Sequence, residues 1–251
     1  SDLRVQGSNQ LASINITVKN PFVIEDRILV AYKGLGGDVV IPDDEGISYI
    51  GPYAFCLYTT DNTIYVDEDD YDANKIPQAN TTVTSVTVPY GVEDIQKYAF
   101  YNCTGLESVT LPSTIRFVRE YTFAGDVNLK VVNNLGEAEV IGAHAFDGCA
   151  SLENADLSKA YAIGESAFKN CSVLESVDLT ALRNTGRGVF EGCTLLGSVK
   201  LTANTKLSRE MFARSGLRTV DIYETVEIPQ FCFADCARLT TVNIHNDLVT
   251  I

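Results

Sequence analysis

Apolar positions along the chain recur with a period of about 22 residues. The phenylalanines mark this period at intervals of 23, 23, 22, 22, 22 and 21 residues, and they are Phe100, Phe123, Phe146, Phe168, Phe190, Phe212 and Phe233. Phe55 stands 45 residues before Phe100, which is about two periods. A fixed period of this kind is typical of solenoids, in which each repeat is one supersecondary unit.

A second pattern follows most of these phenylalanines: Leu, two spacers, Val, one spacer, then Leu or Ile. The copies are Leu106-Val109-Leu111, Leu174-Val177-Leu179, Leu196-Val199-Leu201, Leu217-Val220-Ile222 and Leu239-Val242-Ile244. Apolar residues that alternate with polar ones predict a short strand with one buried face. Each phenylalanine is expected to anchor the return half of its coil, near an aliphatic residue followed by glycine, as at Ile50-Gly51, Ile141-Gly142 and Ile163-Gly164.

One coil cannot bury its own apolar side, so the coils are expected to stack and share a core. The strands would then lie side by side as a parallel sheet, about 4.8 Å apart. The sequence therefore predicts a right-handed leucine-rich repeat solenoid. A parallel β-sheet would form one face, and short irregular, 3₁₀ or strand segments would form the other.

The repeat unit L-x-x-V-x-[LI]-P-x-x-[VI]-x-x-I-G-x-x-A-F-x-x-C resembles the BspA-type leucine-rich repeat family of bacterial cell-surface proteins. The best copies are residues 108–112, 141–149 and 163–171. The resemblance covers about residues 39 to 251, and some coils depart from it, because Thr185-Gly186, Leu207-Ser208 and Ile228-Pro229 replace Ile-Gly. The resemblance implies a surface module that binds a host protein, a matrix component or another microbe.

The ends of the repeat array carry their own signals. Residues 1–38 are interpreted as N-terminal cap strands with a β-hairpin at 22–32, because an open solenoid end exposes core and unpaired strand edge. Residues 39–251 are interpreted as about nine coils. The coil at 60–82 is expected to be degenerate. Ile64 and Val66 keep the strand offsets from Phe55, but the acidic run at 67–72 replaces the half coil that should follow. The last coil is expected to be truncated, with more repeats to follow in the full protein.

Composition narrows the classes of partner. The chain has 251 residues and a formal net charge of −14, which disfavours nucleic acid and anionic lipid as partners. No apolar stretch reaches the roughly 18 residues that span a membrane, so no membrane insertion is expected. No signal-peptide pattern follows Ser1, so no signal peptide is expected within this sequence.

Metal binding has two candidate signals. Five of the 7 cysteines lie three residues after a repeat phenylalanine, namely Cys103, Cys149, Cys171, Cys193 and Cys236. These five are expected to form an inward ladder of small apolar residues rather than a zinc or disulfide site. Calcium at Asp67, Asp69, Asp70 and Asp72 is a weak alternative to a solvated acidic loop, because the EF-hand order is missing. No cofactor is therefore predicted.

The sequence offers little support for a catalytic function. The 2 histidines, His144 and His245, lie several coils apart, and no G-x-S-x-G motif is present. The aspartates at one strand position of neighbouring coils are close enough for glycosidase chemistry, but an open sheet offers no pocket to raise the pKa of one of them. The sequence predicts a protein that is not an enzyme, with a hydrolase as a remote alternative.

The residues between the apolar strand positions are expected to point out of the core and to line one continuous sheet. The candidate partner-binding residues on this face are Thr87, Thr110, Asp156, Asp178, Lys200, Asp221, Tyr223 and Asn243. Ordinary solvent-facing strand residues would look similar. Repeat proteins commonly bind partners on such extended surfaces.

The predicted function is a non-enzymatic cell-surface or secreted binding module. It would act as a monomer that recognises a protein or glycan on a host or microbial surface. A structural spacer, or stalk, of a larger surface protein is the alternative, and the rather uniform polar face favours it.

Overall fold

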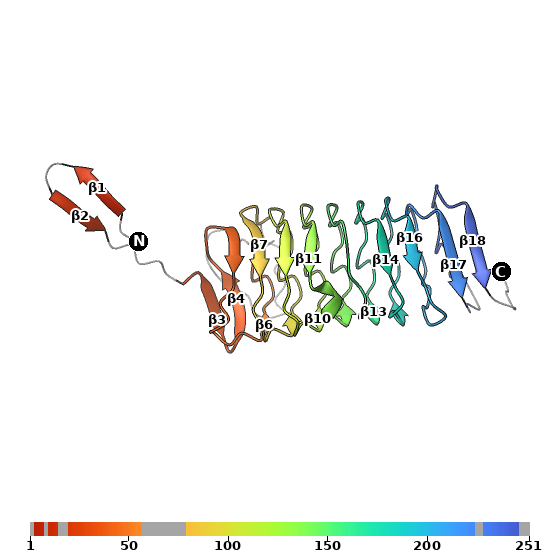
Figure 1. Cartoon of the computed structure of the whole chain (residues 1–251), viewed down its shortest axis with the longest axis horizontal. Helices are drawn as coiled ribbons and strands as arrows, with labels where there is room; N and C mark the ends of the chain where they lie inside the picture. The colour runs from red at the N-terminus through yellow and green to blue at the C-terminus, as the bar shows by residue number, and fades with distance from the viewer. Residues whose placement is uncertain (1–2, 8–9, 15–19, 57–78, 224–227, 246–251) are drawn as a thin grey trace, which may run out of the picture.

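The computed structural model describes residues 3–7, 10–14, 20–56, 79–223 and 228–245. Its coils stack along one long axis as a parallel β-solenoid, from β3 and β4 at one end to β18 at the other (Figure 1). Within the described residues, each of eight turns is marked by one stacked phenylalanine. The predicted solenoid fold is confirmed.

The Val-x-Leu segments form the strands of the predicted face. A four-stranded parallel sheet has the order β11-β9-β7-β5, made of β5 (Gly37–Val40), β7 (Val83–Thr87), β9 (Ser108–Thr110) and β11 (Val131–Asn133). Two parallel pairs follow along the axis, β14 (Ser176–Asp178) with β16 (Ser198–Lys200), and β17 (Thr219–Tyr223) with β18 (Thr241–His245).

The opposite face is more regular than predicted, because six two-residue strands and two longer ones form an eight-stranded sheet with the order β15-β13-β12-β10-β8-β6-β4-β3. Its parallel members are β4 (Ile28–Tyr32), β6 (Tyr49–Ile50), β8 (Asp94–Ile95), β10 (Phe117–Val118), β12 (Val140–Ile141), β13 (Ala162–Ile163) and β15 (Asn184–Thr185). The aliphatic residues of the Ile-Gly pairs thus end short strands. The 3₁₀ helix η1 (Leu135–Glu137) joins β11 to β12.

The hairpin predicted at residues 22–32 is present as β3 (Phe22–Glu25) and β4, which pair antiparallel. Because β4 also pairs with β6 in parallel, the hairpin caps the eight-stranded sheet. The strands β1 (Leu3–Gly7) and β2 (Gln10–Ile14) form an antiparallel pair of their own. Among the described residues, neither of them pairs with a strand of the solenoid.

The predicted degenerate coil at 60–82 is wrong as a turn of the solenoid. Strand β5 pairs directly with β7, β6 pairs directly with β8, and the rings of Phe55 and Phe100 stack at 4.6 Å. No turn therefore separates the coils of Phe55 and Phe100. The strand predicted at Ile64 and Val66 lies outside the described residues. Among the described residues, eight coils are thus seen, against the predicted total of about nine.

A third hydrogen-bond ladder connects the turns around each phenylalanine. The N–H groups of Tyr121, Phe123 and Gly125 donate to the carbonyl oxygens of Ala143, Ala145 and Asp147 in the next coil, at 2.8 to 3.0 Å. Between them, the N–H group of Ala124 donates within its own turn, to the Tyr121 carbonyl oxygen three residues back at 3.3 Å. This alternation requires positive φ two residues before and two residues after the phenylalanine, as in Tyr121 (φ 58°) and Gly125 (φ 82°).

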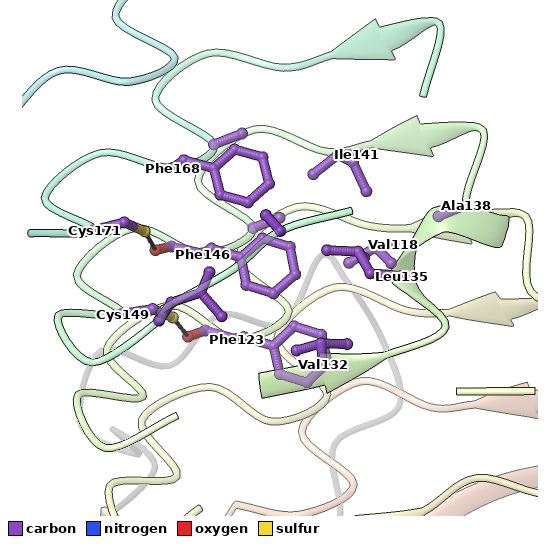
Figure 2. Close-up of a cluster of buried hydrophobic side chains, with 14 of the residues drawn as sticks. Val118, Phe123, Val132, Leu135, Ala138, Ile141, Phe146, Cys149, Phe168 and Cys171 are labelled. Carbon is purple, nitrogen blue, oxygen red and sulfur yellow. Dashed lines mark hydrogen bonds between the residues drawn. The ribbon is translucent and has the colours of Figure 1, made fainter. Parts of the chain in front are cut away.

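The core lies between these three ladders (Figure 2). The phenylalanine rings stack in one column, with centroids 4.6 to 5.8 Å apart and nearly parallel planes. Burial of each such ring contributes roughly 1.5–3 kcal/mol. Beside the column, the thiol of Cys149 donates to the carbonyl oxygen of Phe123 at 3.1 Å, and that of Cys171 donates to Phe146 at 3.3 Å.

Candidate functional site

The predicted binding face is divided into segments, and one break falls at Asp156. The stretch 153–157 forms no strand, and Ala155 stands there where most coils carry Val. The Asp156 carboxylate accepts a hydrogen bond from the Ser158 N–H at 3.0 Å. This carboxylate also lies against Gly136 of η1. The expectation that Asp156 joins a continuous sheet is therefore wrong.

The N-terminal segment of this face, formed by β5, β7, β9 and β11, carries hydroxyl groups and aliphatic side chains. Thr87 pairs in register with Thr110, and the Thr110 hydroxyl accepts a hydrogen bond from Asn133 at 3.2 Å. At its first strand, Asp38 accepts hydrogen bonds from Ser85 at 2.7 Å and from Thr84 at 3.1 Å, which lower the pKa of Asp38. The polar groups of this segment are thus engaged mostly with one another.

The C-terminal segment, formed by β14, β16, β17 and β18, is different because it combines charges with aromatic rings. Asp178 and Lys200 are partners in register and form an ion pair at 3.0 Å. Hydrogen bonds from Thr180, together with those from Lys200, lower the pKa of the Asp178 carboxyl. Both side chains remain substantially exposed, so the pair is accessible to a partner.

On the last two strands, Asp221 accepts hydrogen bonds from His245 at 2.9 Å and from Asn243 at 3.0 Å, and both lower the pKa of Asp221. The Tyr223 ring stacks on His245 with centroids 4.6 Å apart. We call Asp178, Lys200, Asp221, Tyr223, Asn243 and His245 the sheet patch. Five of these six residues were predicted from the sequence.

The cysteines lie as an inward ladder. Cys103, Cys149, Cys171 and Cys193 are fully buried, Cys236 is half-buried, and each thiol donates to the carbonyl oxygen of the preceding stacked phenylalanine. Burial raises the pKa of Cys193 to about 12, so the thiol form persists. In the described part of the chain, no group of three or more His, Cys, Asp or Glu side chains could hold a metal ion.

The two histidines stay apart. His144 stacks on Tyr121 and pairs with Asp147 at 2.9 Å, whereas His245 belongs to the sheet patch. The coils of Phe168, Phe190 and Phe212 lie between them. The weakly predicted calcium ligands Asp67, Asp69, Asp70 and Asp72 lie outside the described residues.

Sequence reasoning missed three features. His245 was read only as a catalytic candidate, although its register with Tyr223 follows from the 22-residue spacing. A row of aromatic side chains two residues before the phenylalanines was visible as Tyr53, Tyr98, Tyr121 and His144. Asp126 takes the cysteine position in the coil of Phe123 and is fully buried.

Among the described residues, no helix has the length and apolar character needed to cross a bilayer.

Comparisons with known proteins agree on the repeat. A sequence profile described as "BspA type Leucine rich repeat region" matches the chain in 6 copies, over residues 37–133, 74–195 and 162–251. No curated protein matches the chain.

Two solved structures share the fold. One is a leucine rich cell surface protein from Faecalibacterium prausnitzii A2-165, with 22% identity and a TM-score of 0.57, in a match that covers 98% of this chain and 56% of that one. The other is the leucine-rich repeat protein of T. pallidum, with 22% identity and a TM-score of 0.51, where the match covers 91% of this chain and 79% of that one. The chain thus spans little more than half of the Faecalibacterium protein.

Proposed function

The chain belongs to the BspA-type leucine-rich repeat family, and from this premise we propose that it is a non-enzymatic binding module of a secreted or cell-surface bacterial protein. Its partner would be a protein or a glycan on a host or microbial surface, and the module would act as a monomer. The Faecalibacterium relative is described as a cell surface protein, which supports this location.

The observation that carries the proposal is the sheet patch. A spacer needs only a uniform polar face, but this patch combines an ion pair, a hydrogen-bonded Asp–Asn–His group and a stacked Tyr–His pair on four strands. Aromatic side chains with a polar end are enriched at interfaces because they offer contact area and hydrogen bonds together. An extended repeat surface is a common place for such a site.

A second function, a structural spacer, is supported by the N-terminal segment of the same face. There the hydroxyl and carboxyl groups of Asp38, Thr84, Ser85 and Thr110 bond to neighbouring strands, which leaves little asymmetry for a partner to recognise. Hydrolysis is the remote alternative. The ion-paired and hydrogen-bonded carboxylates Asp178 and Asp221 have lowered pKa values, which suits surface contacts better than general acid catalysis.

A binding screen tests the proposal. Immobilised matrix proteins and glycans would be probed with the wild type, with the variant Asp178→Asn, Asp221→Asn, Tyr223→Ser, and with a control that carries Asp38→Asn and Val40→Ser on the N-terminal segment. Recognition through the sheet patch predicts a target whose binding falls at least about tenfold, or about 1.4 kcal/mol, in the first variant only. Equal binding by all three proteins would place the site elsewhere, and no binding at high protein concentration would favour the spacer.

A further inference from the structure

A column of aromatic side chains runs along the outside of the turns, on a different surface from the sheet patch. The rings of Tyr53, Tyr98, Tyr121 and His144 stack in sequence, with centroids 5.0, 4.9 and 4.7 Å apart and planes within 7° of parallel. Tyr101 packs edge-on against Tyr98 at 5.6 Å. We call these five residues the aromatic edge. All five side chains are partly exposed.

The fold does not require aromatic residues at this position. The four stacked residues have left-handed φ angles of 55° to 62°, a region that bulky side chains rarely adopt. In the next two coils the same position holds Ser166 and Gly188, which have positive φ angles and support the same ladder. The inner phenylalanine column already joins these coils. Four consecutive aromatic residues at a conformationally unfavourable place therefore point to a role at the surface.

The surroundings of Tyr121, within the aromatic edge, are acidic. Partial burial raises the pKa of Tyr121, and the nearby carboxylates of Asp147, Glu165 and Glu120 raise it further. The charged form of a tyrosine is an anion, so these carboxylates disfavour it and would favour a cation beside the Tyr121 hydroxyl. The chain as a whole has a formal net charge of −14. A positively charged partner thus complements both the local and the overall charge.

We propose that the aromatic edge binds an extended, arginine-bearing segment of a partner protein. The rings repeat once per coil along the solenoid axis, so an extended chain along this axis meets successive tyrosines. A guanidinium group presents five N–H donors in a plane, which lets it donate to a tyrosine hydroxyl and pair with a carboxylate at once. A lysine ammonium lacks this fork, so the site favours arginine.

Calorimetric titration with two capped octapeptides, alternating Arg-Gly and alternating Lys-Gly, tests the proposal at two salt concentrations. The edge variant carries Tyr121→Ser and His144→Ser, which reproduce Ser166 at the same backbone conformation. The control carries Tyr90→Ser and Tyr161→Ser, which remove two tyrosines that are 76% and 43% exposed elsewhere. We expect affinity for the Arg peptide to fall about tenfold in the edge variant and to stay within about twofold in the control.

A second pair of variants removes charge instead of rings and remains informative if the edge variant folds poorly. Glu120→Gln with Glu165→Gln should weaken binding of the Arg peptide severalfold, whereas Glu153→Gln with Glu175→Gln changes the net charge equally and should weaken it much less. Equal affinity for the Arg and Lys peptides, or an equal loss of affinity in a variant and its control, would overturn the proposal. Binding would then depend only on the overall negative charge of the protein. A neutral oligosaccharide that binds the wild type and is lost in the edge variant would overturn it in favour of a glycan.

Discussion

At the residue scale, Asp126 departs from the repeat that surrounds it. Cys103 and Cys149 occupy the equivalent position in the two neighbouring coils, but Asp126 places a carboxyl group there at 0% exposure. One oxygen accepts the Cys103 N–H at 2.6 Å, and the other has no hydrogen-bond partner. Burial raises the pKa of Asp126 well above its ordinary value, which favours the neutral form of the carboxyl group.

Replacing Asp126 with serine should stabilise the protein. Ser215 occupies the same position in a later coil and contacts the Cys236 thiol at 3.4 Å, so the fold accepts a hydroxyl there. A buried polar atom without a partner costs about 1–3 kcal/mol, and we expect the free energy of unfolding at pH 7 to rise by a comparable amount. Urea unfolding measures it, with exposed Asp235→Ser as the control, which should change stability by less than about 0.5 kcal/mol. Destabilisation by Asp126→Ser would show that the carboxyl group has a compensating partner.

The same residue should make stability depend on pH. A carboxyl group whose folded pKa exceeds its unfolded value adds stability that is fully present below the unfolded pKa and is lost as pH rises toward the folded pKa. For Asp126 this loss begins near the ordinary value of 3.8. We therefore expect the free energy of unfolding of the wild type, relative to Asp126→Asn, to fall as pH rises from 3 to 7. Parallel pH profiles in urea unfolding experiments would contradict the raised pKa.

At the scale of single elements, the short strands of the eight-stranded sheet depend on close contact between coils. A Cβ atom on Gly186, just after β15, would lie 2.1 Å from the Glu165 backbone nitrogen. On Gly197 the nearest atom would be the Leu195 carbonyl oxygen at 3.8 Å. The two glycines thus form a matched pair, one enclosed by backbone and the other open.

Gly186→Ala should destabilise the protein by about 1–3 kcal/mol, because backbone atoms must shift to admit the methyl group. Gly197→Ala should change the free energy of unfolding by less than about 0.5 kcal/mol. Thermal and urea unfolding of both variants provide the measurement. If the two variants matched the wild type equally well, the tight spacing of coils at Gly186 would be in error.

The strands could be predicted from the sequence because Val-x-Leu alternation and the phenylalanine period are local patterns. The break at Asp156 was harder to predict, because Ala155 replaces Val there without changing the period. The aromatic edge was missed for another reason. Its signal, an aromatic residue two positions before Phe, is present in the sequence. The positive φ that turns these rings outward, however, is set by hydrogen bonds to the next coil.

At the scale of the whole molecule, the stack is close to one-dimensional, so each coil depends mainly on its two neighbours. The interval of 45 residues between Phe55 and Phe100 suggested an additional, degenerate coil, because counting periods cannot distinguish a coil from another segment of equal length. Only the direct pairing of β5 with β7 and of β6 with β8 settles which coils are neighbours. The described residues on either side of 57–78 also meet, since the Asn80 side chain donates to the Phe55 carbonyl oxygen at 2.7 Å.

Replacing residues 58–77 with a short Gly-Ser linker should therefore leave the fold intact. A shorter connection between the two coils lowers the entropic cost of bringing its ends together, so the free energy of unfolding should stay the same or rise by about 1 kcal/mol. Urea unfolding of the deletion variant, repeated with and without calcium, provides the measurement. If residues 60–82 supplied a turn of the core, the deletion would instead destabilise the protein by several kcal/mol, since each lost core side chain contributes roughly 1.5–3 kcal/mol.

A calcium-dependent rise in the free energy of unfolding of the wild type that disappears in the deletion variant would assign the acidic run Asp67, Asp69, Asp70 and Asp72 to metal binding. Identical curves with and without calcium would favour a solvated loop.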